Sequence, residues 1–209
     1  MKWLLNNWDQ VAVALGEHIV ISFTSVAIAF ALSIVIGIWA ARDERVFRWA
    51  IAVSGFLYTI PTLAFLALLI PIVGLGKANA IICMVAFSLM IMIRNVATGI
   101  REVPADVVDA ARGMGMTRVQ IVREVELPVA LPVIFAGIRT AAVQVVSGAV
   151  LAAYIGGGGL GDFIMSGIAM MALPQLLVGA IPATLLALGT DRVFGYLQTV
   201  LTPAGMRAR

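Results

Sequence analysis

The chain has 209 residues, of which 62% are hydrophobic and only 12% are charged, and its mean hydropathy is +1.05. A soluble domain is roughly 45–50% apolar and about 25% charged, so this composition excludes an ordinary soluble fold and indicates a membrane protein. The formal net charge of +3 is too small to indicate a nucleic-acid partner, and only the distribution of the charges is informative.

Charged residues divide the chain into five apolar runs. Each run is long enough to cross about 30 Å of hydrocarbon as a helix. We therefore predict a single all-α membrane domain over residues 1–209, with transmembrane helices at about residues 19–41, 49–73, 78–98, 129–153 and 173–193. The N-terminal segment lacks the features of a cleavable signal peptide. We expect that it is not cleaved and that the first span acts as its own insertion signal.

The arginines predict the orientation of these helices. Only Lys2 and Lys77 lie in the loops of one side. Because loops rich in Lys and Arg stay in the cytoplasm, we expect the N-terminus outside and the C-terminus inside. The loop residues on the expected cytoplasmic side are Arg42, Arg45, Arg48, Arg101, Arg112, Arg118, Arg123, Arg192, Arg207 and Arg209.

His18 and Cys83 are single residues of their kinds, and neither indicates a reactive site. His18 lies at the outer edge of the first run without a companion ligand, so a metal site is not expected. Cys83 lies inside the third run and is predicted to be a small core residue, not a reactive thiol.

Pro61 interrupts the second run, because proline has no backbone N–H and its ring clashes with the preceding turn. The carbonyl groups that it frees are tolerated in a membrane only against protein or water. Polar residues flank this point, and others lie in the fourth run. A kink that serves only helix packing is the simpler alternative to a pore. The candidate pore-lining residues are Tyr58, Thr59, Pro61, Thr62, Gln144 and Ser147.

Arg94 and Arg139 lie inside the third and fourth runs, toward the expected cytoplasmic side. An arginine within a span is a functional candidate. The alternative, which we favour, places both near the interface with their charges extended into the headgroup region.

The longest polar segment covers residues 101–128. Pro104 suits the first turn of a helix, and Gly113 and Gly115 are expected to end that helix in left-handed conformations. Thr117 and Gln120 then have capping-box spacing, so a second short helix is expected to about Val125, and Pro128 starts the next span. The segment is either a solvated loop or a docking element, in which small Ala110 and Ala111 and flexible Met114 and Met116 would contact a partner.

A glycine run between the fourth and fifth spans matches G-x-G-x-x-G, the spacing of a dinucleotide-binding loop. Such a loop requires a preceding strand, whereas here a membrane span precedes it on the external side, so nucleotide binding is rejected. We expect either an external turn near the mouth of a pore or a plain flexible turn. The glycines concerned are Gly156, Gly157, Gly158, Gly159 and Gly161.

The polar segment also carries a family resemblance. D-A-A-R-G-M-G at residues 109–115, followed after nine residues by V-E-L-P, resembles the EAA loop of permeases from binding-protein-dependent ABC importers, with Asp109 in place of the usual Glu and Val125 in place of Ile. Y-T-I-P-T-L-A-F at residues 58–65 and I-G-G-G-G-L-G at residues 155–161 resemble the five-span permeases for osmoprotectants such as glycine betaine, carnitine or choline. Permeases for methionine are near relatives and leave an amino-acid substrate as the alternative.

This resemblance implies both a role and partners. The loop would couple the permease to ATP-binding subunits, which would hold ATP and Mg²⁺, while this chain would bind no cofactor and no metal. A second permease, identical or paralogous, an external substrate-binding protein and membrane lipid would be the other partners. The chain has no Walker A sequence and no second histidine, so it is not expected to be an enzyme. An ion-coupled transporter or channel would show carboxylates at the span centres, which are absent. The coupling residues implied are Asp109, Ala110, Ala111, Gly115, Leu127 and Pro128.

Overall fold

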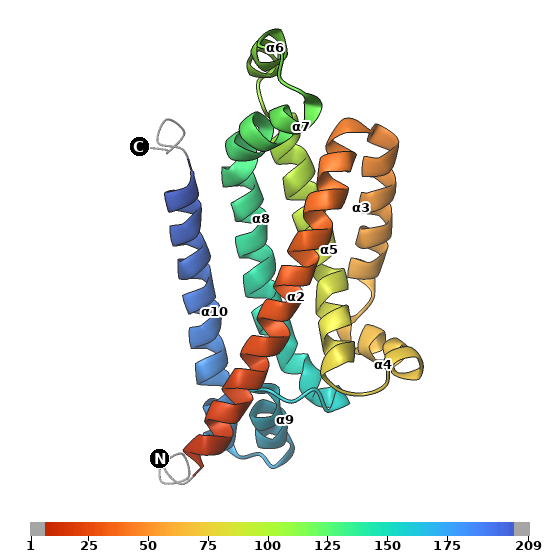
Figure 1. The fold of residues 1–209 in the computed structure, drawn as a ribbon. Helices are drawn as coiled ribbons and strands as arrows, with labels where there is room; N and C mark the ends of the chain where they lie inside the picture. The colour runs from red at the N-terminus through yellow and green to blue at the C-terminus, as the bar shows by residue number, and fades with distance from the viewer. Residues whose placement is uncertain (1–6, 203–209) are drawn as a thin grey trace.

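The computed structural model describes residues 7–202 and shows a bundle of long helices with short helices at both ends (Figure 1). Lys2, Arg207 and Arg209, on which the orientation prediction partly rests, lie outside the described residues. The long helices are α2 (Trp8–Arg42), α3 (Glu44–Thr59), α5 (Lys77–Arg101), α8 (Leu127–Gly148) and α10 (Leu173–Leu201). Within the described part, four continuous helical segments are long and apolar enough to cross a membrane.

The second predicted span is broken rather than continuous. α3 ends at Thr59, α4 covers Thr62–Val73, and the two helices are bent by 100° to one another. Counted as one span, this pair gives the five that the sequence predicts. Ile60 and Pro61 have extended ψ values of 128° and 131°. Proline disfavours a helical conformation in the residue before it, so the chain leaves the helix here instead of kinking. The prediction of one kinked helix over residues 49–73 is therefore wrong.

Several helices extend beyond the apolar runs. α2 begins at Trp8, eleven residues before the predicted start at residue 19, and α10 continues to Leu201, past the predicted end at residue 193. α3 begins at Glu44, where the side chain of Asp43 accepts hydrogen bonds from the amides of Arg45 and Val46. A charge ends an apolar run without ending a helix, because a helix continues wherever its backbone bonds are made.

The core lies where α5 packs between α2 and α8. Small residues permit this close packing, as in many membrane bundles. A side chain at Gly37 of α2 would overlap Val96 of α5, and one at Gly137 of α8 would meet Asn95 of α5. Cys83 is fully buried in this core, as predicted.

Two short helical regions lie at opposite ends of the bundle (Figure 1). α6 (Ala105–Gly113) stands beyond one end, and α9 (Gly161–Ala169) lies at the other. After α6 the chain forms α7 (Arg118–Gln120), the π-helical η1 (Ile121–Glu126), α8 and the 3₁₀-helical η2 (Ala149–Ile155) as one helical segment over Arg118–Ile155. The expected separate second helix, ending near Val125 before a span that starts at Pro128, is therefore wrong.

Candidate functional site

All six predicted pore-lining residues surround one cavity of about 530 Å³. The α3–α4 break supplies residues 58–62, α5 supplies Met84, Phe87 and Ser88, and α8 supplies the remaining wall. The break forms a wall because Ile60 and Pro61 are extended and bring the end of α3, with Tyr58 and Thr59, next to the start of α4, with Thr62. The sequence thus predicts which residues come together, while their role in transport stays a prediction. The six predicted residues in the lining are Tyr58, Thr59, Pro61, Thr62, Gln144 and Ser147.

The cavity is aromatic and uncharged. The Tyr58 and Phe87 rings meet edge to face with their centroids 6.2 Å apart, and the amide of Gln144 donates a hydrogen bond to the hydroxyl of Tyr58 at 3.2 Å. The other polar lining groups are hydroxyls, and every lining residue is uncharged. Volumes of roughly 300–1,000 Å³ are typical of small-molecule sites. The cavity therefore suits a small solute held by ring faces and hydroxyl dipoles.

Sequence reasoning missed Met84, Phe87 and Ser88 of α5. They follow one another at helical spacing, but Met84 and Phe87 are apolar residues in an apolar span and give no contrast from which to identify them. Ser88 is polar and could have been a candidate, although serines within spans commonly serve helix packing. Phe87 belongs both to the cavity wall and to the buried core, where Phe65 packs near it with ring centroids 5.7 Å apart. The cavity is thus built directly on the core.

The segment that resembles a coupling loop lies at the far end of the bundle from α9 (Figure 1). α6 ends in a Schellman motif, in which Met116 N–H donates to Ala111 O at 3.2 Å and Gly115 N–H donates to Arg112 O at 2.9 Å. Gly115 has φ +80° as predicted, whereas Gly113 remains helical, so the expectation of two left-handed glycines is wrong for Gly113.

The exposed surface of this loop is partly apolar. The side chains of Met114 and Val119 are 76% and 74% exposed. Asp109 and Ala110 are also exposed, and Asp109 forms an ion pair with Arg112 at 3.0 Å. Ala111 is buried, and Leu127 and Pro128 are half-buried at the start of α8. The capping box of Thr117 with Gln120 is present as predicted.

Ion pairs fix the base of the loop to the bundle. Arg42 at the end of α2 pairs with the largely buried Glu126 of η1 at 2.6 Å. Arg101 at the end of α5 donates to the carbonyl of Ala40 at 2.8 Å and pairs with Glu44 at 3.0 Å. The sequence shows these charges but not their pairing, because the partners are distant in the chain. These contacts connect the loop and the ends of α2, α3 and α5.

The glycine run is a packed turn, and the expectation of a plain flexible turn is wrong. Gly159 N–H donates to the carboxylate of Glu17 at 3.0 Å, and the same carboxylate pairs with Lys77 at 2.9 Å. Gly156, Gly158 and Gly159 have positive φ values. Any side chain at Gly161 would overlap the carbonyl oxygen of Val150. The turn joins α2, α5 and α9 at the end opposite α6.

His18 lies beside this turn, inside the bundle and not at its edge. Its side chain is fully buried, and Nε2 lies 2.9 Å from the carbonyl oxygen of Val146. No group of three or more metal-ligating side chains occurs within residues 7–202.

Arg139 and Arg94 have different surroundings. Arg139 of α8 makes a bidentate ion pair with Asp191 of α10, at 2.5 and 2.6 Å, and Gly195 leaves room for the guanidinium. Its charge is therefore held between two spans, in contrast to the expectation that it extends into the headgroup region. Arg94 is exposed and has no hydrogen bond or ion pair with any residue in the described part of the chain.

The sequence profile of the family described as "Binding-protein-dependent transport system inner membrane component" matches residues 33–204. The chain is 40% identical over 201 residues to the carnitine transport permease protein OpuCB of Listeria monocytogenes, which covers 96% of this chain and 92% of that protein. It is 38% identical to the choline transport system permease protein OpuBB of Bacillus subtilis, over 99% of this chain and 95% of that protein. It is 35% identical to the osmoprotectant import permease protein OsmW of Salmonella typhimurium, over 99% of both chains.

The fold resembles that of a solved transporter. The MetNI methionine ABC transporter in an inward-facing conformation superposes with a TM-score of 0.84, over 95% of this chain and 99% of that chain, at 21% sequence identity. At this level of identity the likeness concerns the fold.

Proposed function

The chain belongs to the family of inner membrane components of binding-protein-dependent transport systems, and from this membership we propose that it is the permease of an ATP-driven importer for a quaternary ammonium osmoprotectant such as glycine betaine, carnitine or choline. The observation that carries the proposal is the uncharged aromatic cavity between the α3–α4 break, α5 and α8. Relatives over nearly the whole chain are named for carnitine and choline transport.

The chemistry of the cavity supports this substrate class. Aromatic ring faces attract quaternary ammonium groups through their quadrupoles. Tyr58 and Phe87 supply such rings, and Phe65 lies close to Phe87. With no carboxylate in the wall, a positively charged headgroup is held weakly enough to be released again, as a transport pathway requires.

Aromatic side chains mark both ends of the membrane-crossing part. Trp8 begins α2, Trp39 lies near its other end, and both are 64% exposed. Their separation along the helix is about 46 Å at 1.5 Å per residue, close to the ~40–45 Å of a bilayer with its headgroup regions. Tryptophan is enriched at both membrane interfaces, so these residues support contact with lipid headgroups.

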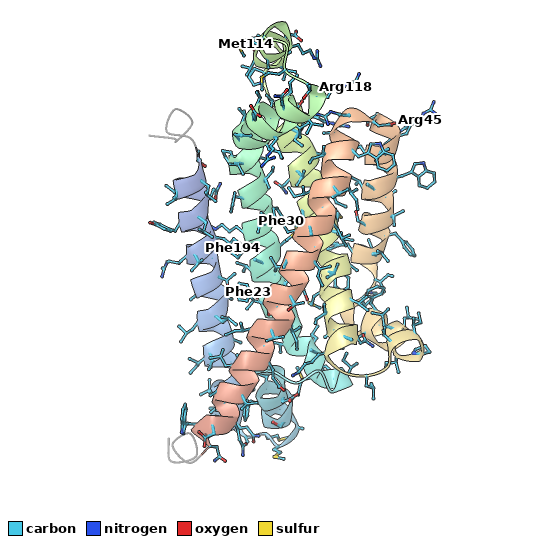
Figure 2. The ribbon with its side chains drawn as sticks, in the orientation of Figure 1. Phe23, Phe30, Arg45, Met114, Arg118 and Phe194 are labelled. Carbon is cyan, nitrogen blue, oxygen red and sulfur yellow. The ribbon has the colours of Figure 1, made fainter. Side chains whose placement is uncertain are left out.

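The distribution of charge supports the proposed orientation. Figure 2 shows Arg45, Arg118 and Met114 at the same end of the bundle. Lys77 begins α5 at the other end, where it pairs with Glu17 beside the glycine turn. By the positive-inside rule the end with α6 is cytoplasmic.

Labelling of intact cells tests this orientation. Cysteines would replace Met114 at the α6 end or Met171, which is 94% exposed beside α9, in a Cys83→Ala background. A membrane-impermeant maleimide added outside should label Met171→Cys and leave Met114→Cys unlabelled until the cells are opened. The reverse pattern would overturn the orientation.

We propose that α6 is the coupling helix. It projects beyond the bundle and exposes apolar Met114, as a docking element requires. Two permeases would form the pathway, two cytoplasmic subunits would bind ATP and Mg²⁺, and an external protein would deliver the solute. Approach of the two ATP-binding subunits would draw their α6 helices together. The Arg42–Glu126 and Arg101–Glu44 pairs would pass this movement to α2, α3 and α5 and alternate access to the cavity.

Uptake by the reconstituted importer tests the function. Proteoliposomes with the permease, its ATP-binding subunits and its binding protein would be offered glycine betaine, carnitine, choline and methionine. ATP-dependent uptake of one or more of the three quaternary ammonium compounds is expected. Uptake of methionine alone would replace the proposed substrate with an amino acid, and uptake driven by an ion gradient without ATP would refute the importer class.

A further inference from the structure

Arg94 is a candidate substrate-binding residue in the membrane part of α5. Arg42, Arg101 and Arg139 have acidic partners. Arg45 and Arg48 of α3 and Arg192 of α10 have no ion pair within the described residues, but among the unpaired arginines only Arg94 lies on α5, the helix that carries Phe87 of the cavity wall. Arg94 is exposed and has no such partner among residues 7–202. An unpaired arginine inside a span is costly in lipid, and such residues face a water-filled path or a ligand.

Arg94 lies along α5 between the cavity and the α6 end of the bundle. It lies seven residues before Arg101, which is about 10 Å from the α6 end of the helix at 1.5 Å per residue. It also lies seven residues after Phe87, and residues seven apart share one helix face. Because Cα–Cβ bonds tilt toward the N-terminus of a helix, the side chain of Arg94 leaves α5 in the direction of Phe87.

The side chain of Arg94 is exposed between the helices that pack against α5. Val96 packs toward α2, Asn95 toward α8, and Met90 toward α3. Arg94 points away from the contacts with α2 and α8. It lies four residues after Met90 and therefore at the edge of the contact with α3, on the side where Phe87 lines the cavity. A solute that moves from the cavity toward the α6 end therefore meets Arg94 next.

The chemistry of a guanidinium then defines the ligand. Arginine binds a carboxylate through two parallel hydrogen bonds. The cavity supplies aromatic rings and hydroxyls but no cation. The quaternary ammonium group of a zwitterion would contact the aromatic rings of the cavity, and its carboxylate would form an ion pair with Arg94.

We propose that Arg94 binds the carboxylate of the transported solute, so that this permease favours zwitterionic quaternary ammonium compounds over a purely cationic one, an inference which rests on the proposed function. Glycine betaine and carnitine carry a carboxylate, whereas choline carries only the positive charge. Arg94 thus sets specificity within the substrate class.

Uptake by variants of the reconstituted importer tests this role. Arg94→Gln should lower the uptake of glycine betaine and carnitine by about tenfold or more, the loss expected for charge-assisted hydrogen bonds, and leave choline uptake equal or higher. Arg94→Lys should retain part of the carboxylate selectivity. The control is Arg48→Gln, because Arg48 is an exposed arginine of α3 away from the cavity. Each rate is compared with the unaltered permease for the same solute, which cancels the preference of the binding protein.

Two results would overturn the proposal. Equal loss for all three solutes at normal membrane abundance would give Arg94 a structural role, such as pairing with a second permease. Unchanged uptake of glycine betaine and carnitine would show that it does not contact the solute. Failure of the proposed function is seen separately, in the unaltered permease. If that permease imports an amino acid instead, the same variants are compared on the amino acid and on its amide, which lacks the carboxylate.

Discussion

Gly115 offers the sharpest test of the coupling loop. Its φ of +80° closes the Schellman motif at the end of α6, and an added Cβ would meet no atom within 4 Å. The cost of Gly115→Ala is therefore conformational alone, about 1 kcal/mol for an L-residue in the left-handed region, or roughly a fivefold shift in population. Gly115→Pro is more severe, because proline cannot adopt this φ and loses the N–H that donates to Arg112.

The chain contains a matched control two residues away. Gly113 is also free of neighbours within 4 Å, but its conformation is helical. Gly113→Ala should leave the loop unchanged or strengthen α6 by up to about 1 kcal/mol. Gly115→Asn should be close to the unaltered protein, because asparagine tolerates the left-handed region.

ATP-dependent uptake and ATP hydrolysis by the reconstituted importer measure these effects. We expect uptake to fall in Gly115→Ala by at most about fivefold and to be abolished in Gly115→Pro, with normal membrane insertion in both. Normal uptake by Gly115→Pro would refute the assignment of α6 as the coupling helix. A loss in Gly113→Ala as large as that in Gly115→Ala would show that the left-handed turn is not the cause.

The remaining predictions concern the end of the bundle opposite α6. Gly161→Ala should destabilise the fold by about 2 kcal/mol through overpacking, because the new methyl group would overlap the carbonyl of Val150. In the control Gly16→Ala the new methyl group meets no atom within 4 Å, so the unfolding temperature in detergent should not fall. Equal unfolding temperatures of the two variants would contradict this packing. Burial, and then the charge of Glu17, raise the pKa of Asp162. The protonated carboxyl of Asp162 therefore favours the folded state at low pH, and this contribution is lost as the pH rises through the folded-state pKa. Asp162→Asn should therefore raise the unfolding temperature at pH 7 and give no gain below about pH 4, whereas the same gain at both pH values would refute this cause.

The membrane-crossing part of the fold could be predicted from sequence because hydrocarbon requires long apolar runs. The ends of the helices could not, since α2 continues for eleven residues before the predicted start and carries Glu17 and His18 within it. Pro61 signals an interruption, but the difference between a kink and a 100° break depends on what surrounds the freed backbone groups. That information lies in tertiary packing.

The candidate cavity was predictable where polar residues or proline stand out in apolar runs, as Tyr58 and Gln144 do. Phe87 could not be predicted, because it is one apolar residue in a predominantly apolar span. The pairing of Arg139 with Asp191 was also out of reach, although both charges are visible, because pairing depends on how α8 and α10 are rotated and shifted against each other. A polar residue or proline that stands out in an apolar run can thus be identified as a candidate from the sequence, but only the fold shows which residue it contacts.

The break between α3 and α4 has a consequence for how such permeases diversify. Ile60 and Pro61 are extended and belong to neither helix. The helical repeat therefore does not constrain which of their side chains face the cavity. A substitution at this break changes the surface that a solute meets while the packing of α2, α5 and α8 is retained. Phe87 lacks this freedom, because the same ring supports the core. On the proposed role of the cavity, substitutions at the break would change the solute while the scaffold is kept.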